Sequence, residues 1–289
     1  MTGWKPTQGH RYRFRMPETS GPRVRALPWV LVALTVLVLG LVMVGPFSGR
    51  KSVDASPTSA VARTTTTTTT TTTVLPPELA GAVLDPGARL DPTWPKTLTL
   101  VTDSVGLGAK DALPKSLPDW KVDVRGRPAL MMNVANKELK AQAQPVGSVA
   151  VVALGYNSLW GRDRANYDAW AKKFDREADE VVATLRGLGA KKVVWVTLRE
   201  PTDAIIPPEA LAAANKYRWF FGYANERIAA LAQRDPGVAV ADWKAVASTR
   251  PGLTYDAIHL RPVGAQLYSE TVKSAVGVTP STVPGLPPA

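Results

Sequence analysis

Apolar residues are unevenly distributed along this chain, and their arrangement divides it into parts of different character. Residues 26–49 contain no charged side chain, and within them the stretch from Trp29 to Val44 is almost wholly aliphatic. Such a length suits the hydrocarbon core of a bilayer, which is about 30 Å thick. We therefore predict a transmembrane anchor over residues 26–46. A secretory signal peptide is the main alternative, disfavoured because no small-residue cleavage site follows at the expected distance, and a buried core helix is a third.

From residue 96 onward, short β-branched runs alternate with longer amphipathic segments. Nearly all-apolar strands separated by helices indicate a parallel sheet that is covered on both faces. We predict a three-layer α/β/α sandwich with a five-stranded parallel sheet, spanning residues 96–277. Strands are expected at 97–102, 121–124, 148–154, 192–198 and 238–241, with helices near 129–142, 165–188, 207–233 and 262–275.

The segments that flank this domain are rich in proline and small polar residues. Residues 47–95 include ten consecutive threonines, Thr64 to Thr73, and residues 278–289 contain repeated prolines. A composition of this kind cannot bury a core, so we predict a disordered linker and a disordered C-terminal tail. The threonine run is a candidate for O-glycosylation, although a simple polar spacer also explains it.

The positive charge of the chain, +11 in total, is concentrated before the predicted anchor. Six basic residues and one acid, Glu18, lie within residues 1–25, whereas only Arg50 and Lys51 follow the anchor closely. The positive-inside rule then places a basic cytoplasmic tail on one side of the plasma membrane and the C-terminal domain outside it. From Lys96 onward 25 basic side chains face 19 acidic ones, a difference of +6, so a nucleic-acid partner is not expected.

The chain contains no cysteine and two histidines, His10 and His259. Disulfides and cysteine nucleophiles are excluded, and a zinc site is disfavoured because its usual ligands are absent or far apart in the sequence. We expect no metal and no cofactor. His10 falls in the predicted cytoplasmic tail, so His259 is the histidine available to the outer domain.

Three candidate site residues follow successive predicted strands. In parallel sheets the site lies beyond the carboxyl ends of the strands. Ser104 follows the first strand, where a helix N-terminus could hold a nucleophile, although Asp103 or Ser104 could simply cap that helix. Gly126 follows the second strand and could allow close approach of a bound group, or be an ordinary loop glycine. Asn157 follows the third, as an oxyanion donor or as a turn residue.

A carboxylate and an imidazole stand three positions apart before the last predicted helix. Asp256 could accept from one nitrogen of His259, which leaves the other nitrogen to take a proton from a serine hydroxyl. The alternative is a surface histidine that caps the helix beginning at Pro262. Each of these signals is weak alone, but their joint order is much less expected by accident.

These motifs resemble the four blocks of the SGNH (GDSL-type) hydrolase superfamily over residues 97–276. The matching residues are Ser104 in Thr-Asp-Ser-Val, Gly126, Asn157 in Gly-Tyr-Asn-Ser and His259 in Asp-Ala-Ile-His. The resemblance implies a flavodoxin-like sandwich, with Ser104 as nucleophile, His259 as base and Asp256 as its partner. It also implies an oxyanion hole formed by the Ser104 and Gly126 N–H groups and the Asn157 side chain. Thr102 and Ser158 depart from the common pattern without removing a catalytic group.

Two segments, 101–109 and 193–199, are similar to extracytoplasmic SGNH domains attached to membrane acyltransferases that modify bacterial envelope polysaccharides. The resemblance implies a membrane-anchored serine esterase or O-acyltransferase acting on acyl esters of a cell-envelope glycan or lipid. A multi-pass membrane acyltransferase is a candidate partner. The alternative is an inactive, tethered glycan-binding or scaffolding module, but that module should have lost part of the triad. Trp160, Trp170 and Trp219 are candidate sugar-stacking residues, with core packing or ordinary surface placement the better explanation for each.

Overall fold

The computed structural model describes residues 75–159 and 164–288. The predicted cytoplasmic tail and anchor, residues 1–46, lie outside these ranges, as does Trp160. Within the described ranges, no helix combines the length and apolar character that crossing a membrane requires. The anchor therefore stays a prediction from the sequence.

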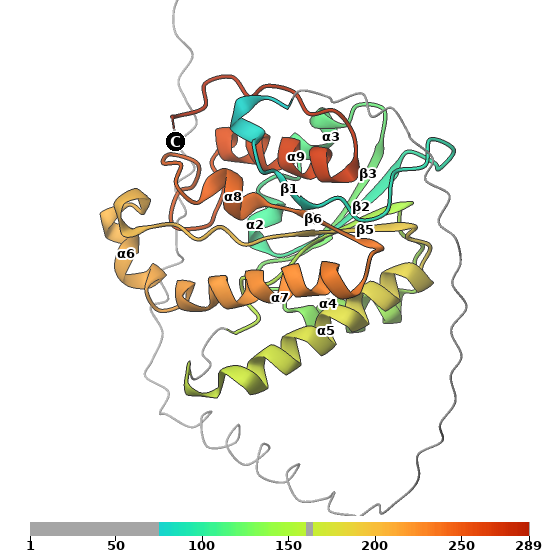
Figure 1. Ribbon diagram of the computed structural model, residues 1–289, viewed down its shortest axis with the longest axis horizontal. Coiled ribbons are helices and arrows are strands. Elements are labelled where there is room, and N and C mark those ends of the chain that lie inside the picture. The colour runs from blue at the N-terminus through green and yellow to red at the C-terminus, as the bar shows by residue number, and fades with distance from the viewer. Residues whose placement is uncertain (1–74, 160–163, 289) are drawn as a thin grey trace, which may run out of the picture. The chain divides into compact units, whose positions relative to one another are not determined.

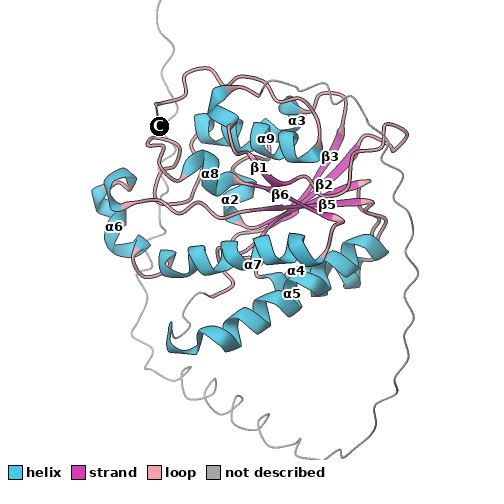
Figure 2. Ribbon diagram, viewed as in Figure 1, coloured by secondary structure: helices cyan, strands magenta, loops and turns pink. Residues whose placement is uncertain are grey.

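A twisted sheet of six strands forms the middle layer of the domain (Figure 2). Its order is β1-β6-β5-β4-β2-β3, with β2 to β6 parallel and β1 antiparallel to β6. The two central strands β4 and β5 are buried along their whole length, as their β-branched composition requires. The strands are β1 (Val83–Asp85), β2 (Thr97–Thr102), β3 (Lys121–Gly126), β4 (Val149–Ala153), β5 (Lys192–Val196) and β6 (Val238–Ala241).

Helices cover both faces of the sheet, which gives the predicted three layers (Figure 1). One face carries α4 (Met132–Gln142), α5 (Tyr167–Gly187) and α7 (Phe221–Arg234), and the other carries α3 (Ala112–Ser116), α8 (Trp243–Ala247) and α9 (Pro262–Val276). The shorter elements are α2 (Ser104–Leu107), α6 (Pro208–Ala214) and the 3₁₀ turns η1 (Pro77–Leu79), η2 (Arg164–Asn166), η3 (Asp203–Ile205) and η4 (Arg218–Phe220).

The five parallel strands follow the flavodoxin-like order 2-1-3-4-5 when counted along the chain. The order reverses between β2 and β4, which are neighbours in the sheet although β3 lies between them in sequence. Ligands of such sheets bind beyond the carboxyl ends of the strands at this reversal. Ser104 follows β2 and Asn157 follows β4, so both lie at that point.

The prediction of five strands and of a disordered linker up to residue 95 was wrong for residues 75–95. This segment contains η1 and the additional strand β1, in which Val83 pairs with Ala241 and Asp85 with Val240. The strand is recruited by the otherwise unpaired edge of β6, and three residues between proline- and glycine-rich turns are too short to show a period.

The predicted disordered tail is also placed against the domain as far as residue 288. Val283 is buried, its N–H donates to Glu78 Oε1 at 3.0 Å, and the N–H of Ser281 donates to Glu270 Oε2 at 2.6 Å. An extended, proline-rich segment shows no periodicity, and its partners here are carboxylates far away in sequence. The predicted helix over 207–233 is divided as well, because α6 ends at Ala214 and Asn215 caps it.

Candidate active site

Ser104 begins α2 directly after β2, and two local features hold it there. Asp103 is the N-cap, and its Oδ1 accepts from the Val105 N–H at 3.0 Å. Gly106 lies so close to the strand that an added Cβ would be 2.1 Å from Thr102 Oγ1. Glycine at position 106 allows this short turn to pack tightly against β2. The tight packing fixes Ser104 at the carboxyl end of that strand.

Asp256, His259 and Ser104 form a continuous chain of hydrogen bonds. Asp256 Oδ1 accepts from the N–H groups of Ile258 and His259, both at 2.8 Å, which fixes the carboxylate in its loop. His259 Nδ1 is 2.7 Å from Asp256 Oδ2, and His259 Nε2 is 3.0 Å from Ser104 Oγ. An ionised carboxylate only accepts, so Nδ1 carries the proton and Nε2 is left to accept from the serine hydroxyl. Ser104 and His259, 155 positions apart in the sequence, thus lie within hydrogen-bonding distance.

Asp256 and His259, the two titratable groups in this run of hydrogen bonds, have shifted pKa values. Burial alone would raise the pKa of Asp256, but hydrogen bonds from the His259 side chain and from the His259 and Ile258 N–H groups bring it down to about 2. The hydrogen bond to Asp256 raises the pKa of His259, opposed by burial and assisted by the charges of Asp256 and Asp103. Asp256 therefore stays ionised at neutral pH and stabilises an imidazolium beside it.

Gly126 ends β3 next to the serine turn. Its register partner in β2 is Thr102, and an added Cβ would lie 2.2 Å from the Thr102 carbonyl oxygen. The sequence suggested close approach to a bound group, whereas the close approach that requires glycine here is to the neighbouring strand. The backbone of Gly126 is thereby held beside the end of β2, two residues before Ser104.

Asn157 lies in the loop after β4, and its Nδ2 donates to Asp103 Oδ2 at 3.0 Å. This bond uses one N–H of the amide, which has a second to offer. Asp103 is fully buried and thus both caps α2 and orients Asn157. Burial raises the pKa of Asp103 to about 7 against the lowering effect of these hydrogen bonds. Sequence reasoning considered Asp103 only as a cap and missed this second role.

Arg199 is a further residue that the sequence did not single out for the site. It follows β5 and is fully buried, and burial lowers its pKa. Its guanidinium is bonded mostly to backbone oxygens of the segment that carries Asp256. The acceptors are the carbonyls of Ala247 at 2.9 Å, Arg250 at 2.6 Å and Ala257 at 3.3 Å, and Thr254 Oγ1 at 2.6 Å.

The same arginine is connected to the loop that carries Asn157. Its backbone N–H donates to the hydroxyl of Tyr156 at 2.7 Å, and Tyr156 directly precedes Asn157. Thr254, which accepts from the guanidinium, donates through Oγ1 to the carbonyl of Asp256 at 2.5 Å. Arg199 therefore links the segment that orients His259 to the loop that presents the asparagine amide.

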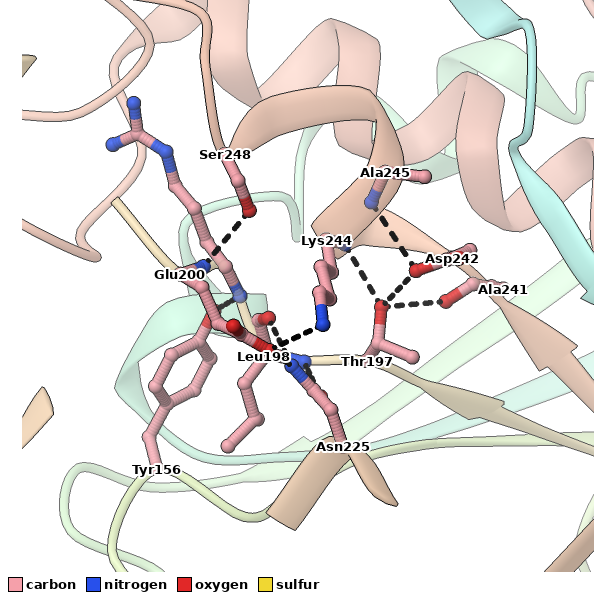
Figure 3. A network of polar contacts seen from close by, with 11 residues as sticks. Tyr156, Thr197, Leu198, Glu200, Asn225, Ala241, Asp242, Lys244, Ala245 and Ser248 are labelled. Carbon is pink, nitrogen blue, oxygen red and sulfur yellow. Dashed lines mark hydrogen bonds and ion pairs between the residues drawn. The ribbon is translucent and has the colours of Figure 1, made fainter. Parts of the chain in front are cut away.

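A polar network fixes the backbone on either side of Arg199 (Figure 3). The amide of Asn225 in α7 accepts from the N–H of Leu198 at 2.7 Å and donates to its carbonyl at 2.8 Å. Glu200 accepts from Asn225 and pairs with Lys244 at 2.9 Å, while its N–H donates to Ser248 Oγ at 2.9 Å. The segment after β5 is thus attached to α7 on one side and to the α8 region on the other.

The remaining candidates of the sequence are placed as follows. Trp170 and Trp219 are partly buried and pack against the core, which agrees with the simpler explanation for them. In residues 75–159 and 164–288, no group of three or more His, Asp or Glu side chains is arranged to hold a metal ion.

Comparison with known proteins gives solved structures only, since no protein-family model and no curated protein matches the chain. One similar structure is the catalytic domain of Streptococcus pneumoniae peptidoglycan O-acetyltransferase A, with 23% identity, a TM-score of 0.43 and coverage of 64% of this chain and 94% of that one. An acetyl xylan esterase has 15% identity and a TM-score of 0.47, and the match covers 62% of this chain and 99% of that one. A GDSL-lipase-like protein from Parabacteroides merdae has 13% identity and a TM-score of 0.49, and the match covers 66% of this chain and 99% of that one.

Structures similar to this chain include SGNH and GDSL-type hydrolases. They belong to the class that the sequence motifs resemble. Because these TM-scores are below 0.5, the inference of function rests on the geometry of the site.

Proposed function

We propose that this protein is a serine esterase or O-acyltransferase that works through an acyl-enzyme. The observation that carries the proposal is the chain from Ser104 through His259 to Asp256, with distances of 3.0 Å and 2.7 Å. A serine hydroxyl is a weak nucleophile unless a base takes its proton, and a base within hydrogen-bonding distance, oriented by a third group, supplies this.

In the first half of the reaction, Ser104 Oγ attacks the carbonyl carbon of an ester and its proton passes to His259 Nε2. The carbonyl double bond opens to an oxyanion. When the oxyanion collapses, the bond to the alcohol oxygen breaks and His259 returns the proton to that oxygen. The products are a free alcohol and an acyl group on Ser104, while Asp256 stabilises the transient imidazolium.

The oxyanion would be held by the N–H groups of Ser104 and Gly126 and by the second N–H of Asn157. Each such donor, when fixed in advance, contributes about 3 kcal/mol to transition-state stabilisation. The bond between Asn157 and Asp103 supports this role because it orients the amide before substrate binds. The tight packing of Gly126 on β2 fixes the backbone donor in the same way.

In the second half, water or a sugar hydroxyl attacks the acyl carbon and gives its proton to His259. The bond between the acyl carbon and Ser104 Oγ then breaks, and His259 returns the proton to Ser104 Oγ. Water makes the protein an esterase, and a sugar makes it a transferase. We propose a cell-envelope glycan or lipid ester as substrate, and an outer domain attached to the plasma membrane through residues 26–46. A multi-pass membrane acyltransferase could then supply acyl groups.

The test is hydrolysis of p-nitrophenyl acetate by the full-length chain purified in detergent. Ser104→Ala should lower the rate at least about a thousandfold. Ser274→Ala, a matched change in α9, should leave it unaltered. Equal rates for Ser104→Ala and the parent chain would refute the nucleophile assignment. A fluorophosphonate that does not label Ser104 would instead favour the non-catalytic glycan-binding module.

Esterase and transferase activity are separated by adding a wall oligosaccharide as acceptor. Mass spectrometry then compares acylated sugar with free acid. Acylated sugar that depends on Ser104 indicates transfer, and free acid alone indicates hydrolysis.

A further inference from the structure

The segment that carries Asp256 and His259 folds back on itself as a small hairpin. Thr254 and Leu260 form an antiparallel bridge, and the N–H of Tyr255 donates to the carbonyl of His259 at 2.8 Å. Tyr255 and His259 are therefore directly opposite one another. Opposite residues of an antiparallel pair point to the same face, with Cβ atoms about 5 Å apart. Thr254 and Leu260 are buried, so the other face, which carries Tyr255 and His259, is the outer one.

Tyr255 is unusually exposed for an aromatic residue, and yet its ring is held in place. The residue is 58% exposed, and the guanidinium carbon of Arg261 lies 4.8 Å from the ring centroid. Arg261 is fixed in turn, because its Nε donates to the Thr254 carbonyl at 2.8 Å. One face of the ring is thus covered by Arg261, and a ligand that stacks on the exposed part would meet a surface that needs little further ordering.

A surface pocket of about 650 Å³ begins at Tyr255 and extends between α3, α9 and the C-terminal segment. Three lining side chains can form hydrogen bonds with a ligand, namely Asp111, Lys115 and Gln266. A long acyl chain needs an apolar channel, whereas a sugar offers a ring of hydroxyls and an apolar C–H face. The lining combines these polar side chains with apolar residues such as Ala112 and Ala265, next to the exposed Tyr255. This combination matches the hydroxyls and the C–H face of a sugar better than a lipid tail.

We propose that this pocket binds a pyranose ring of the glycan substrate, with its C–H face stacked on Tyr255 and its hydroxyls bonded to the polar side chains of the lining. The proposal rests on the proposed function and narrows its substrate class to a glycan. Tyr255 is opposite His259 in the hairpin, and neither His259 nor Ser104 lines the pocket itself. The pocket therefore adjoins the triad and would hold a ring of the glycan next to the acylated one.

The binding test does not need turnover. Isothermal titration calorimetry measures the Kd of mono-O-acetylated chitotriose for the full-length Ser104→Ala chain, and for the same chain with Tyr255→Leu or Tyr255→Phe. Tyr255→Leu should weaken binding about three- to tenfold, because the leucine has no aromatic face. Tyr255→Phe should stay within about twofold. Equal affinity of the Leu variant and its parent, or equal loss in both variants, would overturn the proposal.

The kinetic test separates sugar binding from support of the triad. In the otherwise unchanged chain, Tyr255→Leu should raise KM for the acetylated chitotriose by a larger factor than KM for p-nitrophenyl acetate, which offers no sugar ring to stack. A matching loss on both substrates would assign Tyr255 a structural role and refute the proposal. If Ser104→Ala proves as active as the parent, the esterase proposal fails while calorimetry still tests Tyr255. If Tyr255→Leu weakens binding to phosphatidylglycerol vesicles and leaves sugar binding unaltered, the proposal is refuted and the surface is assigned to lipid instead.

Discussion

Replacement of Arg199 by methionine tests how the two halves of the site are held together. Methionine retains an unbranched apolar stem but removes every donor of the guanidinium. Three of the lost bonds are buried, namely those to the carbonyls of Ala247 and Ala257 and to Thr254 Oγ1. The fourth acceptor, the Arg250 carbonyl, is only partly buried, so water can replace the guanidinium there.

The expected destabilisation follows from these contacts. A buried acceptor left without a donor costs about 1 to 3 kcal/mol. The Ala247 carbonyl keeps the Arg250 N–H as a donor at 3.3 Å, so the other two buried acceptors together cost about 2 to 6 kcal/mol. Removing a buried charge regains part of this, since burial lowers the Arg199 pKa and therefore disfavours its charged form. We expect Arg199→Met to lower the free energy of unfolding by about 2 to 4 kcal/mol, a large part of the 5 to 15 kcal/mol typical of a domain.

A functional change should accompany the loss of stability. With the loop freed, Asp256 is held less firmly against His259, so the raised pKa of His259 should fall toward its ordinary value. The ascending limb of the pH–rate profile would then move to lower pH, and kcat would fall. Arg199→Lys should lie between the two proteins, because one ammonium group cannot reach all these acceptors.

Denaturant unfolding followed by circular dichroism gives the free energy, and p-nitrophenyl acetate hydrolysis gives the pH profile. Arg234→Met is the control, since Arg234 makes ion pairs at the surface of α7, where such pairs contribute less than about 1 kcal/mol. A loss below about 1 kcal/mol for Arg199→Met, with an unmoved pH profile, would refute this account.

Three further predictions concern the groups around Ser104. The kcat/KM of the parent chain should rise with pH through a His259 pKa above its ordinary value, since only the neutral imidazole accepts a proton. Consistent with the same role, Asp256→Asn should lower the rate about a thousandfold or more. Gly126→Ala should abolish activity and lower the melting temperature, because its Cβ would lie 2.2 Å from the Thr102 carbonyl oxygen. The Asp103 pKa is raised to about 7 in the folded protein, so the folded state keeps this proton at pH values where the unfolded chain has lost it. Stability is therefore highest below about pH 4, and the urea midpoint should fall as the pH rises from 4 to 8. Asp103→Asn should flatten that slope.

The parallel part of the sheet could be predicted from the sequence because its strands are short segments rich in β-branched residues and separated by amphipathic stretches. The strand expected at 97–102 matches β2, and that at 238–241 matches β6. The edge strand β1 could not be found, since its three residues carry no pattern and pair only because β6 leaves an edge free. The C-terminal segment was missed for a similar reason, because Glu78 and Glu270 hold it from a distance.

For the site, the sequence could identify groups whose chemistry is evident from their type and their place after a strand. Ser104 and Asn157 are such groups, His259 is marked by the carboxylate three positions before it, and the structure brings Ser104 and His259 within hydrogen-bonding distance. It could not identify groups that act by holding others. An arginine after a strand is normally read as a surface residue, and nothing near Arg199 in sequence indicates that its acceptors are 48 to 58 positions away.

Asp103 and Arg199 show why this part of a site depends on the fold. Each is buried, and each bonds two segments that the topology brings together only beyond the carboxyl ends of the strands. Asp103 joins the turn after β2 to the loop after β4. Arg199 joins the loop after β4 to the segment before α9. A chain of bonds thus runs from the Ser104 turn through Asp103, Asn157, Tyr156 and Arg199 to the segment that carries Asp256. If both residues only stabilised the fold, their substitutions would lower stability without moving the His259 pKa. If they position the site, the pH profile must move with Arg199, and stability alone cannot produce that shift.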